Sequence, residues 1–213
     1  RNLRNYGKGY VNFGEPININ QFLNNQVPDW KQAIDPIDPQ KPKWLTPSVN
    51  VLAQQVMTSI NQCAALNGVA LVSLILHATE NKALTKAELI SQLDFFLALQ
   101  RSVPYHAELT IPKETGAQLL EHVILLNKVT INQDSFGDIS SDDETRAKIR
   151  LMAECVNETM QRFAIITSLL SQLAPIKKSE LDEKVVAIAQ RLSVLNNINA
   201  PEFIDKKAQS TLI

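Results

Sequence analysis

Apolar residues recur every three to four positions through most of this chain, a spacing that predicts amphipathic helices. The clearest case follows Pro47, where Val49, Leu52, Val56 and Ile60 would share one helix face. Helices of this kind are predicted at about 20–25, 47–66, 69–78, 86–100, 115–127, 142–163 with an extension to 173, 180–195, and from 201 onward.

Several of these helices begin at residues that can accept hydrogen bonds from free backbone N–H groups. Thr85 and Ser141 are each followed three residues later by a glutamate, Glu88 and Glu144, which is the pattern of a capping box. The predicted N-caps are Asn20, Thr46, Thr85, Ser141 and Ser179.

The stretch "GYVNFGEPI" has a different pattern, because side chains of different character alternate between Tyr10 and Glu15 and a glycine and proline follow. This alternation predicts one strand that ends in a tight turn. A single strand leaves its backbone groups without partners, and strand-like sequence is scarce in the rest of the chain. Only Lys128–Ile139 could add a short strand and turn.

Residues 27–47 contain five prolines in 21 positions, which disfavours regular helix or sheet and predicts a stiff, extended strap. The strap is expected to lie along a surface and to bury its large apolar side chains there. A proline-rich ligand for a partner domain is the alternative, but the irregular spacing disfavours it. The side chains expected to be buried are Trp30, Ile34, Ile37, Trp44 and Leu45.

Composition fits a globular protein, with 45% hydrophobic and 20% charged residues among 213. The formal net charge of −1 gives no broad basic field to attract nucleic acid. The two cysteines, Cys63 and Cys155, are expected to be buried reduced thiols rather than a disulfide. The longest apolar run, 68–76, falls far short of the roughly 20 residues that span a bilayer.

A weak internal repeat relates residues 73–100 to residues 168–192, each with a buried helix, a polar loop and a capped helix that has "EL" in its first turn. Two such units suggest a winged-helix-like module that binds nucleic acid or protein. The alternative is that amphipathic helix pairs simply resemble one another. A recognition helix should carry several exposed cations, but the first unit has only Lys86 and Arg101 at opposite ends.

The residue types that carry out catalysis are sparse. His77, His106 and His122 are the three histidines, and none has an aspartate five positions later. The acidic cluster that begins at Asp134 misses the spacing of an EF-hand, and a solvated turn before a helix start explains it better. The residues therefore indicate no catalytic, cofactor-binding or metal-binding site, and no cofactor.

The motifs "RNLRNYGKGYVNFGEPI", "VPDWKQAIDPID", "QLDFFLALQRSVPY" and "IAQRLSVLNNINAPEFIDK" closely resemble the bacterial glycerol-3-phosphate 1-O-acyltransferases. They occur in that family's order and span nearly the whole chain. The resemblance implies an enzyme that transfers an acyl chain from acyl-CoA or acyl-carrier protein to the 1-hydroxyl of glycerol 3-phosphate in phospholipid synthesis.

The resemblance covers only the part that follows the family's active site. The family's His-x4-Asp motif, in which the histidine acts as the base, has no counterpart here, so the fragment itself is expected to be non-catalytic. The family also has a further stretch, on the order of a hundred residues, between the parts that match "FGDI" and "RLMAECVNETMQRFAI".

The fold class expected from both lines of reasoning is mainly α. A helical C-terminal domain would follow a short N-terminal strand left from an α/β acyltransferase domain, whose other strands would precede Arg1. The expected division is 1–26 for the end of the acyltransferase domain, 27–47 for the strap, and 48–139 and 140–213 for the two parts of the helical domain.

The resemblance also implies the partners and the location of the protein. The partners would be the rest of the acyltransferase chain, its substrates bound through the missing catalytic domain, and a membrane surface, with no nucleic acid. The location would be the cytoplasmic face of the bacterial inner membrane, as a peripheral protein.

Overall fold

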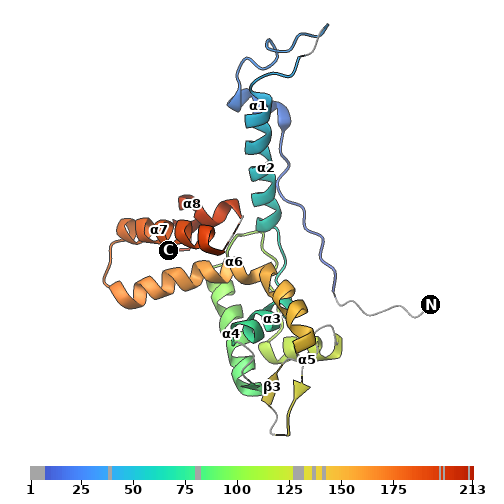
Figure 1. Ribbon diagram of the computed structural model, residues 1–213, viewed down its shortest axis with the longest axis vertical. Coiled ribbons are helices and arrows are strands. Elements are labelled where there is room, and N and C mark those ends of the chain that lie inside the picture. The colour runs from blue at the N-terminus through green and yellow to red at the C-terminus, as the bar shows by residue number, and fades with distance from the viewer. Residues whose placement is uncertain are drawn as a thin grey trace, which may run out of the picture.

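The computed structural model describes residues 8–37, 40–79, 83–126, 132–135, 138–140, 143–196, 198, 200–210 and 212–213. Helices dominate these residues, so the mainly α class is confirmed (Figure 1). The elements are α1 Ile19–Gln26, α2 Leu45–Gln62, α3 Gly68–Ala78, β1 Leu84–Thr85, α4 Lys86–Ser102, α5 Gly116–Leu126, β2 Asn132–Gln133, β3 Asp138–Ser140, α6 Asp143–Leu173, α7 Lys178–Asn196, the 3-10 helix η1 Pro201–Ile204 and α8 Lys206–Ser210.

The hydrophobic core lies where α3 packs along the long helix α6, with α4, α5 and α7 around this pair (Figure 1). Nearly all of α3 is buried because its sequence "GVALVSLILHA" is apolar on every side. The predicted helix at 69–78 is thus confirmed with one added residue. Fully or nearly fully buried core residues include Leu71, Val72, Ile75, Leu89, Leu93, Leu97, Leu120, Val123, Val185 and Phe203.

The start of α5 fits against α4 only because residue 116 is a glycine. A Cβ at Gly116 would lie 2.8 Å from the Ile90 carbonyl oxygen and 2.9 Å from Leu93 Cβ, closer than side-chain carbons approach their neighbours. The Gly116 N–H also donates to Asp94 Oδ1 at 2.6 Å. These contacts fix the crossing of α4 and α5 and thereby one wall of the cleft described below.

Three short strands form a small antiparallel sheet in the order β1-β3-β2. Ile139, in the central strand, pairs with Leu84 and Gln133 and is buried against the core. The strand and turn predicted at 128–139 are confirmed for residues 132–135 and 138–139, whereas residues 128–131, 136 and 137 lie outside the described residues.

An arm made of residues 8–62 projects from the helical body, with α2 as its shaft and α1 at its outer end (Figure 1). The segment predicted as a strand, Tyr10–Glu15, runs extended beside the end of α2, and no strand is assigned to it in the described part of the chain. Asn12 holds this segment to the body, because its Nδ2 donates to the Cys63 carbonyl oxygen at 2.7 Å and to Thr110 Oγ1 at 2.9 Å.

Two predicted N-caps in the arm are wrong. Asn18 caps α1 in place of Asn20, since its side chain accepts from the Gln21 N–H at 3.1 Å. Thr46 lies inside the first turn of α2, which begins at Leu45 after Trp44, a residue that already has helical backbone angles. The turn that leads from Pro42 into Leu45 starts this helix without a side-chain cap.

The remaining caps have mixed outcomes. The capping box of Thr85 and Glu88 is present, with the Glu88 N–H donating to Thr85 Oγ1 at 3.1 Å and the Thr85 N–H donating to Glu88 Oε2 at 2.9 Å. Ser179 is not a cap, because α7 begins at Lys178 and the Leu181 N–H already donates to the Lys177 carbonyl oxygen at 2.9 Å. Ser141 lies outside the described residues.

The proline-rich strap is more exposed than its sequence predicts. Ile37 is 92% exposed, so its predicted burial is wrong. Trp30 and Trp44 are half-buried, and Trp30 Nε1 donates to Asn24 Oδ1 on α1 at 2.9 Å. The strap therefore folds back on the outer end of the arm instead of lying along the helical body.

Candidate functional site

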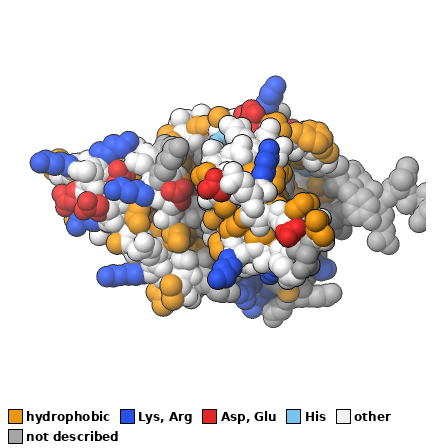
Figure 2. All heavy atoms as spheres, turned by 90° about the horizontal axis from the view of Figure 1, so that it is seen from above, with side chains coloured by type: hydrophobic (Ala, Val, Ile, Leu, Met, Phe, Trp, Pro, Cys, Tyr) orange, Lys and Arg blue, Asp and Glu red, His pale blue; other side chains and the backbone are white. Residues whose placement is uncertain are grey.

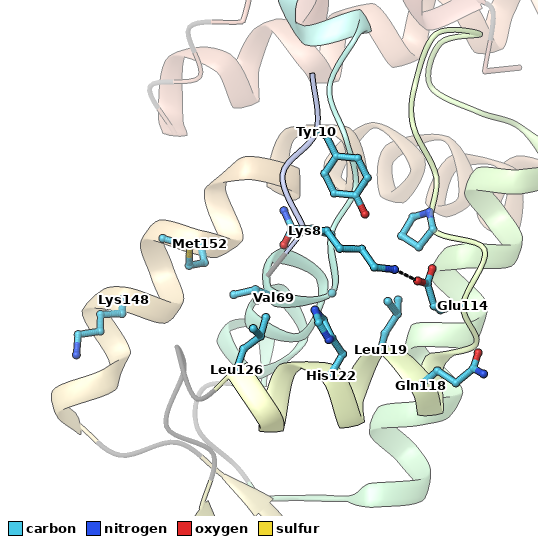
Figure 3. A pocket seen from close by; sticks show the side chains of 13 residues that line it. Lys8, Tyr10, Val69, Glu114, Gln118, Leu119, His122, Leu126, Lys148 and Met152 are labelled. Carbon is cyan, nitrogen blue, oxygen red and sulfur yellow. Dashed lines mark hydrogen bonds and ion pairs between the residues drawn. The ribbon is translucent and has the colours of Figure 1, made fainter. Parts of the chain in front are cut away.

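A cleft of about 650 Å³ lies between α3, α5 and the first turns of α6 (Figure 3). Lys8 and Tyr10 reach over α5 on one side of it, while α6 carries Lys148 and Met152 on the other. We call this the α5–α6 cleft. Its lining is mainly apolar, from Tyr10, Val69, Leu119, Leu126 and Met152, with polar groups from Lys8, Asn67, Glu114, Gln118, His122 and Lys148.

The local sequence explains the shape of the α5–α6 cleft. Leu119, His122 and Leu126 recur at three- and four-residue spacing, so they share one face of α5. Asn67 caps α3 by accepting from the Ala70 N–H at 2.9 Å, which places the start of α3 in the floor. Gly68 there leaves room for α5, since a Cβ would lie 3.2 Å from Val123 Cγ2.

An ion pair joins Lys8 to Glu114 at one side of the cleft (Figure 3). The hydrogen bond from Lys8 lowers the pKa of the Glu114 carboxyl, and the same bond raises the pKa of the Lys8 amine. Exposed pairs of this kind add little stability. The pair instead helps to hold the extended segment that carries Lys8 and Tyr10 over the cleft.

A second polar feature, the Arg162 cluster, is buried at the base of the arm. It consists of Asn61, Tyr105, Glu158, Arg162 and Glu202. Arg162 has no exposed surface, and its Nη2 donates to Glu158 Oε1 at 2.8 Å. Glu202 Oε1 accepts from Tyr105 Oη at 2.9 Å and from Asn61 Nδ2 at 2.6 Å. The cluster thus connects α2, the loop after α4, α6 and η1.

Burial dominates the electrostatics of the Arg162 cluster. Loss of water raises the pKa of the Glu158 carboxyl, an effect that the neighbouring Arg162 charge opposes. Loss of water also raises the pKa of the Tyr105 hydroxyl, which keeps it protonated as a donor to Glu202. Among the described residues, Arg162 Nε and Nη1 have no hydrogen-bond partner. The guanidinium carbon lies 4.7 Å from the Tyr105 ring centroid and 5.8 Å from that of Phe203. Aromatic faces thus take the place of hydrogen-bond acceptors around this cation.

The three histidines do not come together. His77 is exposed in the last turn of α3, His106 lies in the loop after α4, and His122 lines the α5–α6 cleft. His106 Nδ1 accepts from the Glu108 N–H at 3.2 Å, as expected of a turn. Across the described residues, no three His, Cys, Asp or Glu side chains are grouped as metal ligands would be.

The remaining sequence candidates have structural roles. Asp134 closes the β2–β3 turn, because its Oδ1 accepts from the Asp138 N–H at 2.9 Å. Cys63 and Cys155 are both free, but neither is buried as predicted. Sequence reasoning missed the Arg162 cluster. Its signal was an arginine on the apolar stripe of α6, between Met160 and Ile166.

Both polar features connect segments of the chain, and neither assembles a base with a substrate-binding cation in the manner of an acyltransferase active site. The fold is that of a mainly helical region whose polar clusters join its segments. A family model described as "Glycerol-3-phosphate acyltransferase C-terminal region" matches residues 1–148 and 130–213. The chain belongs to this family.

Two relatives, both named glycerol-3-phosphate acyltransferase, match the whole chain. The protein of Colwellia psychrerythraea is 49% identical over 307 residues, which cover 38% of its length. The protein of Pseudoalteromonas translucida is 32% identical over 303 residues and 37% of its length. The chain therefore spans well under half of the relatives it matches.

No solved structure matches this chain. Within the described residues, none of the helices combines the length and the apolar character needed to cross a membrane.

Proposed function

We propose that this chain is the C-terminal helical region of an enzyme that transfers an acyl group from acyl-CoA or acyl-carrier protein to the 1-hydroxyl of glycerol 3-phosphate. The chain itself would hold no transfer site and would instead support the catalytic part. Family membership supports the enzyme assignment, since both relatives carry the name of this acyltransferase. The observation that carries the supporting role is the exposed apolar surface of the arm.

Large apolar side chains are exposed along the whole arm. Phe13 is 88% exposed although it lies next to Asn12, which is tied to the body. Val49, Val56, Met57 and Ile60 recur at three-, four- and seven-residue spacing and so share one face of α2, and a contiguous exposed apolar face of this kind marks a docking site. The alignment covers only 38% of the Colwellia protein. The remaining part of such an enzyme would be the partner that docks on this surface. The exposed residues are Tyr10, Val11, Phe13, Ile19, Ile37, Val49, Val51, Val56, Met57 and Ile60.

The chemistry of acyl transfer supports the division of labour. Attack by an unactivated hydroxyl needs a positioned base, and a phosphate substrate needs cations that converge on it. His77, His106 and His122 stand on separate elements. The substrates would therefore bind to the part of the enzyme outside this chain.

We do not favour the alternative hypothesis of a winged-helix-like module that binds nucleic acid. Arg101, the cation expected to be exposed near the end of the first unit, is used inside the fold, because its Nη2 donates to the carbonyl oxygens of Pro112 at 2.6 Å and Glu114 at 2.9 Å. Figure 2, seen from the end where the arm projects, shows charges of both signs scattered between hydrophobic side chains. Nucleic acid would require a basic face.

We further propose a peripheral location at the cytoplasmic face of the bacterial inner membrane. Supporting this, the end of α6 carries the partly exposed Leu170 and Leu173, and two exposed lysines follow, Lys177 in the turn and Lys178 at the start of α7. Apolar side chains flanked by cations suit an anionic lipid surface. Binding to vesicles of anionic phospholipid, weakened by Leu173→Glu and by added salt, tests this contact.

The predicted division of the chain also stands as a proposal. The end of α1 at Gln26 supports the boundary at 26–27, whereas the boundary at 139–140 falls inside β3, one residue before its end. The parts 48–139 and 140–213 share one core through α3 and α6, in keeping with two parts of a single helical domain.

The test is an acyl-transfer assay with labelled glycerol 3-phosphate and acyl-CoA. It compares this chain alone with a fusion in which the preceding part of the Colwellia protein is joined at Arg1 and that protein's own interior segment is restored between residues 140 and 143. The fusion should turn over and the chain alone should not. Turnover by the chain alone that disappears in His106→Ala or His122→Ala would contradict the supporting role, and an inactive fusion would contradict the enzyme assignment.

A further inference from the structure

The match to the relatives has an internal break. The Colwellia alignment extends over 307 residues, whereas this chain contributes 213, so about 94 aligned positions of that relative have no counterpart here. The Pseudoalteromonas alignment, over 303 residues, leaves about 90. The family model matches in two parts that meet at residues 130–148, so the missing stretch belongs to that interval.

The break lies beside the α5–α6 cleft. The interval follows the end of α5 at Leu126 and includes the start of α6, which carries Lys148 and Met152 into the lining. A segment inserted between residues 140 and 143 would leave the chain after β3 and return at the first turn of α6, the helix that carries Lys148 and Met152 in one wall of the cleft. Its two ends would therefore be held next to the cleft before any contact forms.

The surface around the break is unusually apolar. Leu125 is 82% exposed and Leu151 is 64% exposed, and the neighbouring Ile124 and Met152 are also exposed. Met152 lines the cleft, and Leu125 and Leu151 each lie three residues from a lining residue, His122 on α5 and Lys148 on α6, whereas Ile124 lies on the opposite face of α5. Exposed apolar side chains beside an apolar cleft are typical of a surface that another part of a protein covers.

We propose that the α5–α6 cleft, together with Leu125 and Leu151 beside it, is the binding site of the interior segment of about 90 residues that the relatives have and this chain lacks. A unit of this size buries only a modest fraction of its own surface, so packing onto an existing apolar cleft adds stability that it would not reach alone. In this chain the cleft is left uncovered. The proposal rests on the family match and not on the supporting role proposed above.

Thiol reactivity tests the proposal. In a Cys63→Ser, Cys155→Ser background, single cysteines are placed at the cleft by Leu125→Cys or Met152→Cys, and at a remote exposed site by Val194→Cys on α7, which is 84% exposed. Each variant is made in the 213-residue chain and in a chimaera that carries the Colwellia segment between residues 140 and 143. In the chimaera the thiols at positions 125 and 152 should react at least about tenfold more slowly than in the 213-residue chain, because a covered thiol reacts only when its cover opens. The Val194→Cys thiol should react at the same rate in both.

Unchanged reactivity at both cleft positions in a chimaera of normal helical content would overturn the proposal. So would slower reaction of the cleft thiols in the 213-residue chain as its concentration rises, since a second copy would then be the occupant. If the chimaera does not fold, cross-linking of the full-length Colwellia protein decides the question. Cross-links from its interior segment to the positions aligned with 119–126 and 148–152 support the proposal, and cross-links from that segment only to other regions overturn it.

Discussion

The guanidinium of Arg162 lies over the ring of Tyr105, with 4.7 Å between its Cζ and the ring centroid, and no part of the Arg162 side chain reaches solvent. The Tyr105 hydroxyl in turn donates to Glu202 Oε1 at 2.9 Å. Through these contacts α6, the loop after α4 and η1 meet at one point, next to Asn61 near the end of α2. The orientation of the arm on the helical body depends on this point.

Arg162→Met should lower the free energy of unfolding by about 3 kcal/mol, because it leaves the partly buried Glu158 carboxylate without its cation. Arg150→Met, on the exposed side of the same helix, is the matched control and should change it by about 0.5 kcal/mol or less. Urea unfolding followed by circular dichroism measures both. Equal effects of the two substitutions would show that the burial of Arg162 is unimportant.

Tyr105→Phe should lower the free energy of unfolding by about 1–2 kcal/mol, since it keeps the ring over Arg162 but removes a hydrogen bond to the buried Glu202. Tyr105→Leu removes the ring as well and should cost more. In the double variant Arg162→Met, Tyr105→Leu, the loss in free energy of unfolding should be smaller than the sum of the two single losses, because the ring–cation contact can be lost only once. Strictly additive costs in this double-mutant cycle would refute the contact.

Gly116→Ala should destabilise the protein by about 1–3 kcal/mol, because the added carbon would meet the Ile90 carbonyl oxygen and the Leu93 side chain. Gly9→Ala is the control, since a Cβ there meets nothing within 4 Å. Thermal unfolding compares the two variants. A Gly116→Ala protein as stable as the control would mean that α4 and α5 do not cross as closely as described.

The capping box predicts a pH dependence. Hydrogen bonds from Thr85, first from its side chain and then from its backbone, hold the pKa of Glu88 below its usual value of 4.5. A carboxyl with a lowered folded pKa stabilises the protein above its unfolded pKa, and this contribution is lost as the pH falls through the folded value. Glu88→Gln should therefore be destabilising at roughly pH 7 and neutral at roughly pH 3.

Urea unfolding at both pH values measures this difference, with the exposed Glu183→Gln on α7 as the control. A cost of Glu88→Gln that is the same at both values would rule out the charged form of Glu88 as the source of the stabilisation.

The elements that could be predicted are those whose signals are local. The capping box at Thr85 and the apolar run of α3 depend only on neighbouring residues, and both formed as predicted. The family resemblance was readable from motifs such as "YVNFGEPI" and is confirmed by the family match. The missing interior stretch was likewise predicted, and the alignment lengths confirm it.

Features that depend on distant segments could not be predicted in this way. The start of α2 at Leu45 is set by a turn from Pro42, and it overrides the cap signal of Thr46. The burial of Arg162 requires a tyrosine 57 positions earlier and a phenylalanine 41 positions later to meet over one guanidinium. The exposure of Ile37 follows from the strap folding on the arm, where the described helices leave it uncovered.

The central claim, that the arm seats the catalytic part of the acyltransferase, is tested most directly by the activity of the fusion described above. Val56→Glu with Met57→Glu places two charges on the apolar surface of α2 and should leave the 213-residue chain folded, because both side chains are partly exposed, Val56 to 38% and Met57 to 49%. In the fusion the same pair should reduce acyl transfer by about tenfold or more, since charges would be buried without partners at the interface. Val194→Glu with Leu195→Glu on α7 is the matched control and should leave turnover unchanged. Full activity of the Val56→Glu, Met57→Glu fusion would contradict the account.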